Sequence, residues 1–244
     1  MLAGRHPEER VERPASHQQW LSLTFLHWPF EPATIQSRLP EGFVVDAFDG
    51  VAWVSMTPFL MAFRVAGLPP IPTMATFPET NLRTYVRGPD GRDGLWFFSL
   101  DAQSLGLVLA ASTLYGVPYR WADMSIAFGE TIRYRSRRRH GPPAGHDIVV
   151  RPGAAIDEPP ALDVWLSGRW RGWTRIAGRP FAVPVHHPPW PLHAATLVAL
   201  EESLFHANGL ARPATPPLVR YSPGTDVRLG LPHPVRGPRL PHGD

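Results

Sequence analysis

The chain has 244 residues, of which 43% are hydrophobic, and its formal net charge at pH 7 is +3. It contains neither lysine nor cysteine, so all 24 of its basic Lys+Arg residues are arginine. These absences exclude mechanisms that need an amine or thiol side chain: lysine Schiff bases, pyridoxal-phosphate anchoring, phosphate-loop lysines, cysteine nucleophiles and thiolate-held metals. The small net charge gives little support to nucleic-acid binding.

A chain of this length is expected to form one domain with a sizeable core. Residues 1–13 mix charges of both signs and lack the apolar run of a signal peptide, and no later stretch is apolar enough to span a bilayer. We therefore expect a cytoplasmic protein with no membrane partner. Residues 1–15 and 232–244 are rich in proline, arginine, glycine and histidine and are predicted to be disordered tails, which leaves 16–231 as the domain.

Thirty prolines and 21 glycines divide the chain into short segments, many of them rich in aromatic and β-branched residues. This pattern predicts a mainly β protein. The segments predicted to be strands are 20–27, 43–48, 51–57, 81–87, 94–100 and 130–137. Asp49-Gly50 predicts a hairpin between two of them, and the glycine-rich loop 88–94 joins another pair, so neighbouring strands are expected to be antiparallel.

Two helices are predicted in the first half of the chain. A short one is expected within 33–39. A longer one is expected over 103–112, where Asp101 is of a type that caps helix N-termini and Gly116 and Pro118 would end the helix.

A third helix is predicted between Pro191 and Asn208-Gly209. Proline suits a first helical turn, and Leu197, Leu200 and Leu204 follow at a spacing typical of a helix face that packs on a core. The asparagine-glycine pair would end this helix.

Polar residues alternate along the segment 77–86, which is predicted to be a strand. Alternation places Glu79, Asn81, Arg83 and Tyr85 on one face. Two interpretations remain open: a polar floor for a pocket, or a solvent-exposed face with an ion pair between Glu79 and Arg83.

Three histidines, His186, His187 and His193, lie close together in the sequence and superficially resemble a metal site. No carboxylate joins them at ligand spacing, and adjacent histidines in a strand point to opposite faces. We therefore expect no metal, but a packed loop with one buried histidine.

The dense basic run is 133–140, which contains five arginines. No aromatic platform or helix-turn-helix accompanies it, so it is expected to be a charged hairpin tip and no nucleic-acid partner is predicted. Motifs for serine hydrolases, zincins, dinucleotide folds and phosphate loops are absent from the sequence, and no cofactor is predicted.

From Trp20 almost to the C-terminus, the sequence resembles the YqjF-like family of bacterial proteins, a domain of unknown function. The matching stretches are 25–30, 39–42, 46–54, 57–59, 77–86, 96–101 and 190–192. Where such proteins have a Thr-Glu-Arg-Tyr-like stretch, this chain has Ser167-Gly-Arg-Trp170, which lacks the acid.

This family is in turn similar to acetoacetate decarboxylases. The similarity implies an α+β fold that is mainly antiparallel β: a closed or half-open barrel with two or three helices and an internal pocket. Gly116 and Pro118 match the turn that carries two lysines in those enzymes, and Tyr119 and Arg120 stand in the lysine positions. Glu79 resembles the acid that precedes that turn.

Three functions follow from these residues. The first is a barrel that binds a small organic ligand, with a carbonyl or carboxylate held by Arg83 or Arg120 and oriented by Glu79, Tyr85 and Tyr119. The second is a lysine-independent lyase, isomerase or hydratase with Glu79 as acid or base and Tyr119 as proton donor.

The third is a structural or interaction protein whose barrel is packed solid. A Schiff-base decarboxylase is excluded under all three, because arginine stays protonated and cannot attack a carbonyl. A homo-oligomer is expected only by analogy with the superfamily.

Overall fold

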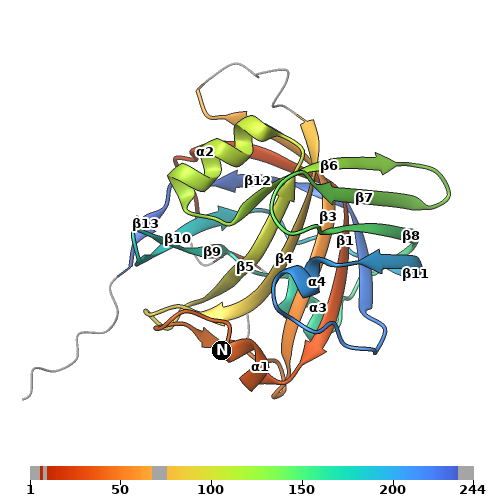
Figure 1. Ribbon diagram of the computed structural model, residues 1–244, viewed down its shortest axis with the longest axis horizontal. Coiled ribbons are helices and arrows are strands. Elements are labelled where there is room, and N and C mark those ends of the chain that lie inside the picture. The colour runs from red at the N-terminus through yellow and green to blue at the C-terminus, as the bar shows by residue number, and fades with distance from the viewer. Residues whose placement is uncertain (1–5, 8–9, 68–75, 236–244) are drawn as a thin grey trace, which may run out of the picture.

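The computed structural model describes residues 6–7, 10–67 and 76–235, in which thirteen strands form one continuous sheet and four short helices cover it (Figure 1). Nine of the strands close into a ring that is antiparallel except for one pair, β5 with β6. Its strands are, in order around the ring, β1 (Ser16–Phe30), β3 (Ala52–Val65), β4 (Thr76–Arg87), β5 (Asp93–Ala102), β6 (Tyr119–Ala127), β7 (Ile132–Arg138), β8 (Gly145–Ala155), β11 (His193–Glu202) and β12 (Leu218–Leu229). The predicted fold class, a mainly antiparallel closed barrel, is confirmed.

Two further strands build a second ring against the first. β9 (Arg171–Ile176) pairs in parallel with β5, and β10 (Arg179–His186) pairs with β9 and with β12. Together with β12, β1, β3, β4 and β5 they form a seven-stranded ring that shares five strands with the nine-stranded one. The short strands β2 (Val44–Val45) and β13 (His233–Pro234) extend the sheet beside β4 and β10.

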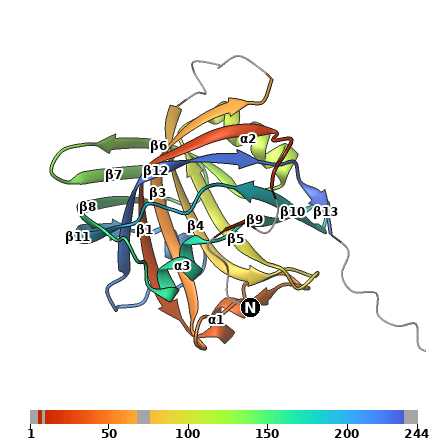
Figure 2. The ribbon, with the colours of Figure 1, turned by 180° about the vertical axis from the view of Figure 1, so that it is seen from behind.

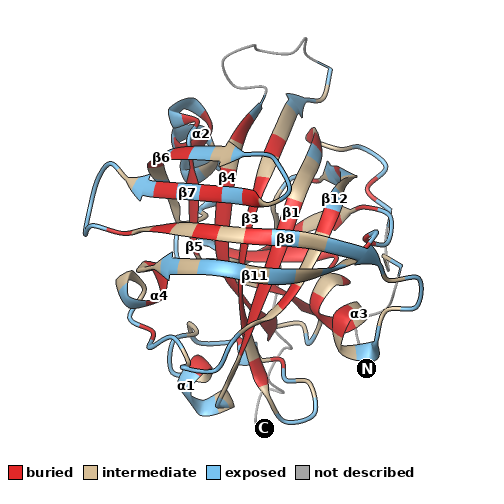
Figure 3. Ribbon diagram, turned by 90° about the vertical axis from the view of Figure 1, so that its right-hand side faces the viewer, coloured by how far each residue is buried: buried red, intermediate tan, exposed pale blue. Residues whose placement is uncertain are grey.

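The five shared strands form a wall between the two rings, which therefore has protein on both faces over most of its length. β4 is buried along nearly its whole length, whereas β11, which belongs only to the nine-stranded ring, alternates between partly buried and exposed residues (Figure 3). Seen from behind, β12 lies between β1 and β10 and pairs with both of them (Figure 2). A strand in this position has no solvated face, so its polar side chains must find partners inside the protein.

The nine-stranded ring holds the largest apolar core. Inward residues from β1, β3, β4, β7 and β8 pack together there. Examples are Trp28, Met56 and Tyr134. Helix α1 (Pro32–Gln36) contributes Ile35, and helix α4 (Leu204–Ala207) contributes Leu204 and Phe205 to the same core.

The other face of the wall is covered by two helices and a loop. Helix α2 (Leu105–Tyr115) packs its Leu107 and Val108 on Phe25 and Phe59 of the wall, together with Trp190. Helix α3 (Ala161–Ser167) packs Trp165 and Leu166 against Tyr85 and Leu95. The seven-stranded ring is therefore closed by elements that lie far from β1 and β3 in the sequence.

Most predicted strands are present, and several are longer than expected. The exception is 43–48, where only Val44–Val45 forms a strand, and it pairs with β4 rather than with the strand that follows it. The Asp49-Gly50 turn is confirmed: both residues have positive φ, and Phe48 and Val51 form a bridge across them. The loop 88–94 joins the antiparallel strands β4 and β5, also as predicted.

The first two helices are present, but the predicted N-cap of the longer one was wrong. Ser104 caps α2 and accepts a hydrogen bond from the Leu107 amide. Asp101 instead belongs to β5, where it is fully buried. Gly116 ends α2 in the left-handed conformation, with φ of 63°, as its position predicted. Helix α3 was not predicted.

The third predicted helix was wrong: residues 193–202 form strand β11, and only the four residues of α4 are helical. A bulge explains the misleading spacing. The register with β8 shifts between Leu197 and Ala199, so Leu197 and Leu200, three residues apart, both pack on the core of the nine-stranded ring. In a bulged strand, two residues that are three positions apart can therefore point to the same side, as they do in a helix.

Of the predicted tails, residues 1–5, 8–9 and 236–244 lie outside the described residues. Within the described parts, Val11 is buried, the Ala15 amide donates to the Leu229 carbonyl, and His233–Pro234 forms β13. None of the helices among the described residues is long and apolar enough to cross a membrane.

Gly88 is required by close packing rather than by its backbone conformation. A Cβ atom there would lie 2.2 Å from Cζ2 of the buried Trp173 ring. We expect Gly88→Ala to lower the free energy of unfolding by about 1–3 kcal/mol, because the rigid ring must move. Gly129→Ala is the matched control, since its nearest neighbouring atom would be 3.7 Å away. Urea unfolding measures both, and equal stability of the two variants would contradict the prediction.

Candidate functional site

The polar face of β4 lies inside the seven-stranded ring. Glu79, Asn81, Arg83 and Tyr85 are all buried, with exposed fractions between 0 and 6%. The alternative of a solvent-exposed face with an ion pair between Glu79 and Arg83 is therefore wrong. β4 is held there because β3 pairs with it on one side and β5 on the other.

The neighbouring strand β3 adds hydroxyl groups to this face. Ser55 lies directly opposite Arg83, and Thr57 lies opposite Asn81. Directly opposed residues in an antiparallel pair point to the same side, so these four side chains share one surface. The Oγ1 atom of Thr57 and the Oδ1 atom of Asn81 are buried and lack a hydrogen-bond partner.

Glu79 and Tyr119 form one end of the site. The Tyr119 hydroxyl, at the start of β6, donates to Oε2 of Glu79 over 3.2 Å. Burial raises the pKa of Glu79 to about 8, even though hydrogen bonds from Tyr119 and Asn81 oppose the shift. At neutral pH this carboxyl group is therefore mostly protonated and can itself donate a hydrogen bond. Glu79 and Tyr119, both predicted as site residues, therefore lie in contact.

Arg83 is a buried cation without a carboxylate partner among the residues that the structure describes. Its Nε–H has no hydrogen-bond acceptor, and its guanidinium lies 5.8 Å from the centre of the Phe25 ring. Burial lowers the pKa of Arg83, and the adjacent Tyr85 oxygen partly opposes that shift. An uncompensated charge in this position is unfavourable, so an anion would be stabilised beside it.

Other buried arginines of the described chain do have carboxylates. Arg138 makes a bidentate contact with Asp101 through Nε and Nη2, both at 2.8 Å, on the nine-stranded side of the wall. Arg169 pairs through Nη1 with Asp46 at 2.7 Å and with Asp93 at 2.9 Å. Arg83 differs from both, because no carboxylate among the described residues pairs with it.

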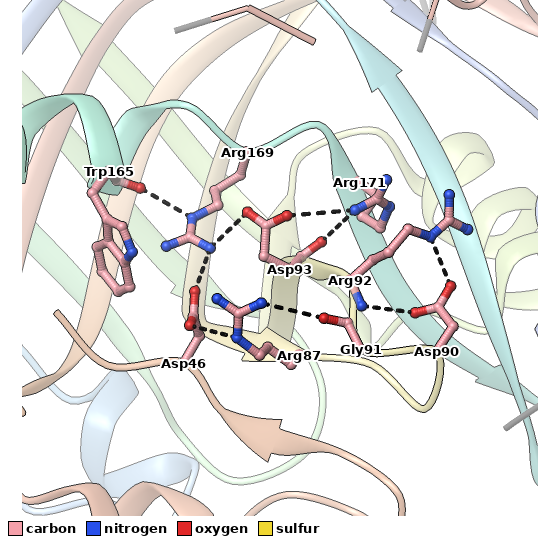
Figure 4. Close-up of polar contacts among 9 residues, drawn as sticks. All are labelled: Asp46, Arg87, Asp90, Gly91, Arg92, Asp93, Trp165, Arg169 and Arg171. Carbon is pink, nitrogen blue, oxygen red and sulfur yellow. Dashed lines mark hydrogen bonds and ion pairs between the residues drawn. The ribbon is translucent and has the colours of Figure 1, made fainter. Parts of the chain in front are cut away.

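Arg169 is the centre of a network at the base of the seven-stranded ring (Figure 4). Its Nε donates to the Trp165 carbonyl, and its guanidinium stacks 4.1 Å from the Trp165 ring centre. Asp46 also pairs with Arg87, and Asp93 also accepts from Arg171. The network ties the segment before β3, the start of β5 and the α3–β9 connection together.

A directional chain of hydrogen bonds positions Tyr85 beside Arg83. The Tyr85 hydroxyl donates to the Leu166 carbonyl over 3.0 Å, so the Ser55 hydroxyl, 2.7 Å away, must donate to Tyr85. The Ser55 oxygen then accepts from Nδ1–H of His27 over 2.6 Å. Burial, with contributions from Arg83 and Arg220, holds the pKa of His27 well below its usual value, which keeps this ring neutral.

An aromatic cluster around His187 reaches Arg83 through Trp190 and Phe25. His187 lies among Trp170, Trp190 and Trp20, at centroid distances of 4.6, 5.1 and 6.3 Å. Its Nδ1 donates to the Pro188 carbonyl over 2.6 Å. Burial lowers the pKa of His187 to about 4, and the charge of Arg83 contributes to this shift.

Arg120 does not join the site. It is exposed, and its guanidinium donates to the Tyr119 carbonyl. Strand alternation explains this, because Tyr119 points inward and the next residue must point out. The expectation that Arg120 faces the pocket was wrong, and Arg83 remains as the interior cation.

The histidine-rich segment runs from the end of β10 through a loop to the start of β11, and His187 is its one buried histidine, as expected. Across the described residues, no group of three or more histidine, aspartate or glutamate side chains could hold a metal ion. In the basic run, Arg133 and Arg135 pair with Asp147 across to β8, and Arg139 pairs with Asp123. These arginines therefore form ion pairs on the outer face of the sheet.

Sequence reasoning missed His27, Ser55, Thr57 and Arg169 as parts of this region. For Ser55 and Thr57 a signal existed: they alternate with apolar residues along a predicted strand, as the residues of β4 do. Arg169 lies in the stretch 167–170 noted above for its missing acid, but its partners could not be predicted, because its two aspartates lie 123 and 76 residues away.

The two-ring architecture is that of acetoacetate decarboxylase-like proteins. An acetoacetate decarboxylase-like enzyme from Sphingomonas wittichii RW1 superposes with a TM-score of 0.61 at 16% identity, covering 92% of this chain and 94% of that one. The enduracididine biosynthesis enzyme MppR, solved with pyruvate, gives a TM-score of 0.62 at 14% identity and covers 93% of each chain. Similarity at this level defines the fold.

The sequence relationship is more specific. The profile of DUF2071, described as an uncharacterized conserved protein, matches residues 17–226. The uncharacterized protein YqjF of Bacillus subtilis (strain 168) is 36% identical over 214 residues, which are 86% of this chain and 88% of that protein. The chain belongs to the DUF2071 family, as its YqjF-like motifs predicted.

The raised pKa of Glu79 makes stability depend on pH. Its folded value of about 8 lies above the reference value of 4.5, so between these pH values the folded protein holds a proton that the unfolded chain releases. Wild-type stability should fall as pH rises through this window relative to Glu79→Gln, by up to about 1.4 kcal/mol per pH unit. Urea unfolding from pH 5 to 8 measures the difference. The exposed Glu201, changed to Gln, is the control, and a constant gap between wild type and Glu79→Gln would show that the pKa is not raised.

Proposed function

We propose that this protein binds a small organic carboxylate or carbonyl compound inside the seven-stranded ring. The observation that carries the proposal is the buried Arg83, which has an unpartnered Nε–H and no carboxylate partner among the described residues. Folded proteins pair buried charges, and a site that keeps one unpaired fits a ligand of opposite charge. A carboxylate suits the planar guanidinium, which can donate two parallel hydrogen bonds.

The remaining polar groups suit a second oxygen of the same ligand. Thr57 and protonated Glu79 can donate to a carbonyl or hydroxyl oxygen, and Asn81 has a free acceptor. The Phe25 ring lies beside Arg83 and packs against Trp190 in an apolar cluster. A few polar groups converging within an apolar enclosure are typical of small-molecule sites.

The fold relatives support a ligand of this size. MppR was solved with pyruvate, a small carboxylate that also carries a carbonyl group. That ligand belongs to MppR, and pyruvate is therefore a probe for this chain rather than its assigned ligand.

The first test compares Arg83→Met with Arg120→Ala, which is exposed and serves as the matched arginine control. We expect Arg83→Met to weaken pyruvate binding about 10- to 150-fold, because a hydrogen bond to a charged group contributes about 1.5–3 kcal/mol. Isothermal titration calorimetry or ligand-observed NMR measures the affinity. Binding by Arg120→Ala should match the wild type.

Stability distinguishes a lost ligand site from a damaged fold. Without ligand, Arg83→Met should unfold at a higher urea concentration than the wild type, because an uncompensated buried cation is replaced by an apolar side chain of similar length. Equal affinity in wild type and Arg83→Met would contradict the proposal. So would a wild type that binds neither pyruvate nor acetoacetate.

The proposed binding is noncovalent, because the chain has no lysine side chain that could form a Schiff base. Treatment with borohydride in the presence of pyruvate or acetoacetate should add no mass to the protein, and acetoacetate should not be decarboxylated. Mass spectrometry of the intact protein reads out the first result. A trapped side-chain adduct would refute this part of the proposal.

A further inference from the structure

A second candidate site lies on the outer surface, where β1 and β4 begin and β3, β10 and β12 end. A groove of about 1100 Å³ opens there, lined by those strand ends and by the segment Arg10–Glu12. It is distinct from the interior face that carries Arg83, since none of Glu79, Asn81 and Arg83 borders it. Its lining contains three arginines and two histidines among the described residues.

Four of these residues form a single row across four adjacent strands. Arg64 of β3 lies opposite His17 of β1, His17 lies opposite Arg228 of β12, and Arg228 lies opposite His186 of β10. Directly opposed residues in antiparallel pairs point to the same side of a sheet, so the row presents four nitrogen-bearing side chains to one surface. Arg10 borders the same groove.

The arginines of this row are not engaged by acids. In the described part of the chain, neither Arg64 nor Arg228 forms an ion pair with a carboxylate, whereas Arg133 and Arg135 share Asp147 on the outer face of β7 and β8. Of the acids lining the groove, Asp226 already accepts a hydrogen bond from Gln19 over 2.9 Å. Within the described residues, the row therefore keeps guanidinium donors that no carboxylate occupies, unlike Arg133 and Arg135.

We propose that this groove binds the phosphate or diphosphate group of a small molecule. Neighbouring strands lie about 4.8 Å apart, so the backbones of Arg64 and Arg228 are about 10 Å apart with His17 between them, and two flexible guanidinium groups can converge on one anion from either side. Arginine forks match phosphoryl oxygens, and imidazole N–H groups add further donors.

The shape of the site favours a small molecule over a polymer. A recessed groove encloses a compact anion, and Glu12 and Asp226 at its border would repel an extended polyanion. This inference is independent of the ligand proposed for the interior, because the two sites share no residue named for either.

The test uses inorganic pyrophosphate and phosphate as probes with the full chain. Isothermal titration calorimetry at low salt should show saturable binding of pyrophosphate, tighter than that of phosphate, and weaker as salt increases. The double variant Arg64→Ala/Arg228→Ala should bind about tenfold or more weakly. Arg133→Ala/Arg135→Ala removes two arginines from β7 that are also exposed, and it should bind as the wild type does.

The outcomes separate the alternatives. The site is supported if only the Arg64/Arg228 variant loses pyrophosphate affinity while its urea unfolding curve stays unchanged. Absence of saturable binding by the wild type overturns it, as does an equal loss in both double variants, which would indicate attraction to net charge alone. Tighter binding of a long single-stranded DNA than of pyrophosphate through the same two arginines would overturn the small-molecule assignment. Unchanged pyruvate affinity in the Arg64/Arg228 variant is expected, because Arg83 lies elsewhere.

Discussion

The structure depends on one constraint: the wall formed by β12, β1, β3, β4 and β5 is shared by two rings. Where both rings cover it, as along most of β4, neither face is solvated, and polar side chains must find their partners inside the protein. The apolar residues of the wall divide by alternation between the two cores. Each polar residue of the wall needs, in addition, a hydrogen-bond or ion-pair partner inside the protein. A polar group without such a partner is a candidate for binding a ligand.

Buried arginines on and around the wall illustrate the alternatives. Arg138 is neutralised by Asp101, and Arg169 by Asp46 and Asp93, so both connect distant parts of the chain while remaining inaccessible to a ligand. Removing one partner from such a pair leaves a buried charge and typically destabilises a protein by about 3–5 kcal/mol. Arg83 lies on the same wall without such a partner among the described residues, although His27, Ser55 and Tyr85 are arranged around it. The anionic ligand proposed above would supply the partner that Arg83 lacks.

The chain shares its fold with an acetoacetate decarboxylase-like enzyme, and it contains no lysine. In its interior Tyr119 presents a hydroxyl group to Glu79, whose raised pKa keeps the carboxyl protonated near neutral pH. The result is a site with hydrogen-bond donors at one end and a guanidinium further along the strand. Such a site can hold and polarise an oxygenated molecule without forming a covalent bond to it.

The sequence by itself determined the β-rich class and the lack of any lysine for a Schiff base. It also determined the shared face of Glu79, Asn81, Arg83 and Tyr85, because alternation in a strand is a local property with a period of two. Only the tertiary structure decided that this face is buried, because burial depends on β9 and β10 closing the second ring. The bulge in β11 misled the helical interpretation, since one inserted residue makes a strand resemble a helix over a few positions. The aspartate partners of Arg169 and the row from Arg64 to His186 were likewise invisible in the sequence, because they join residues that only strand register and chain closure bring together.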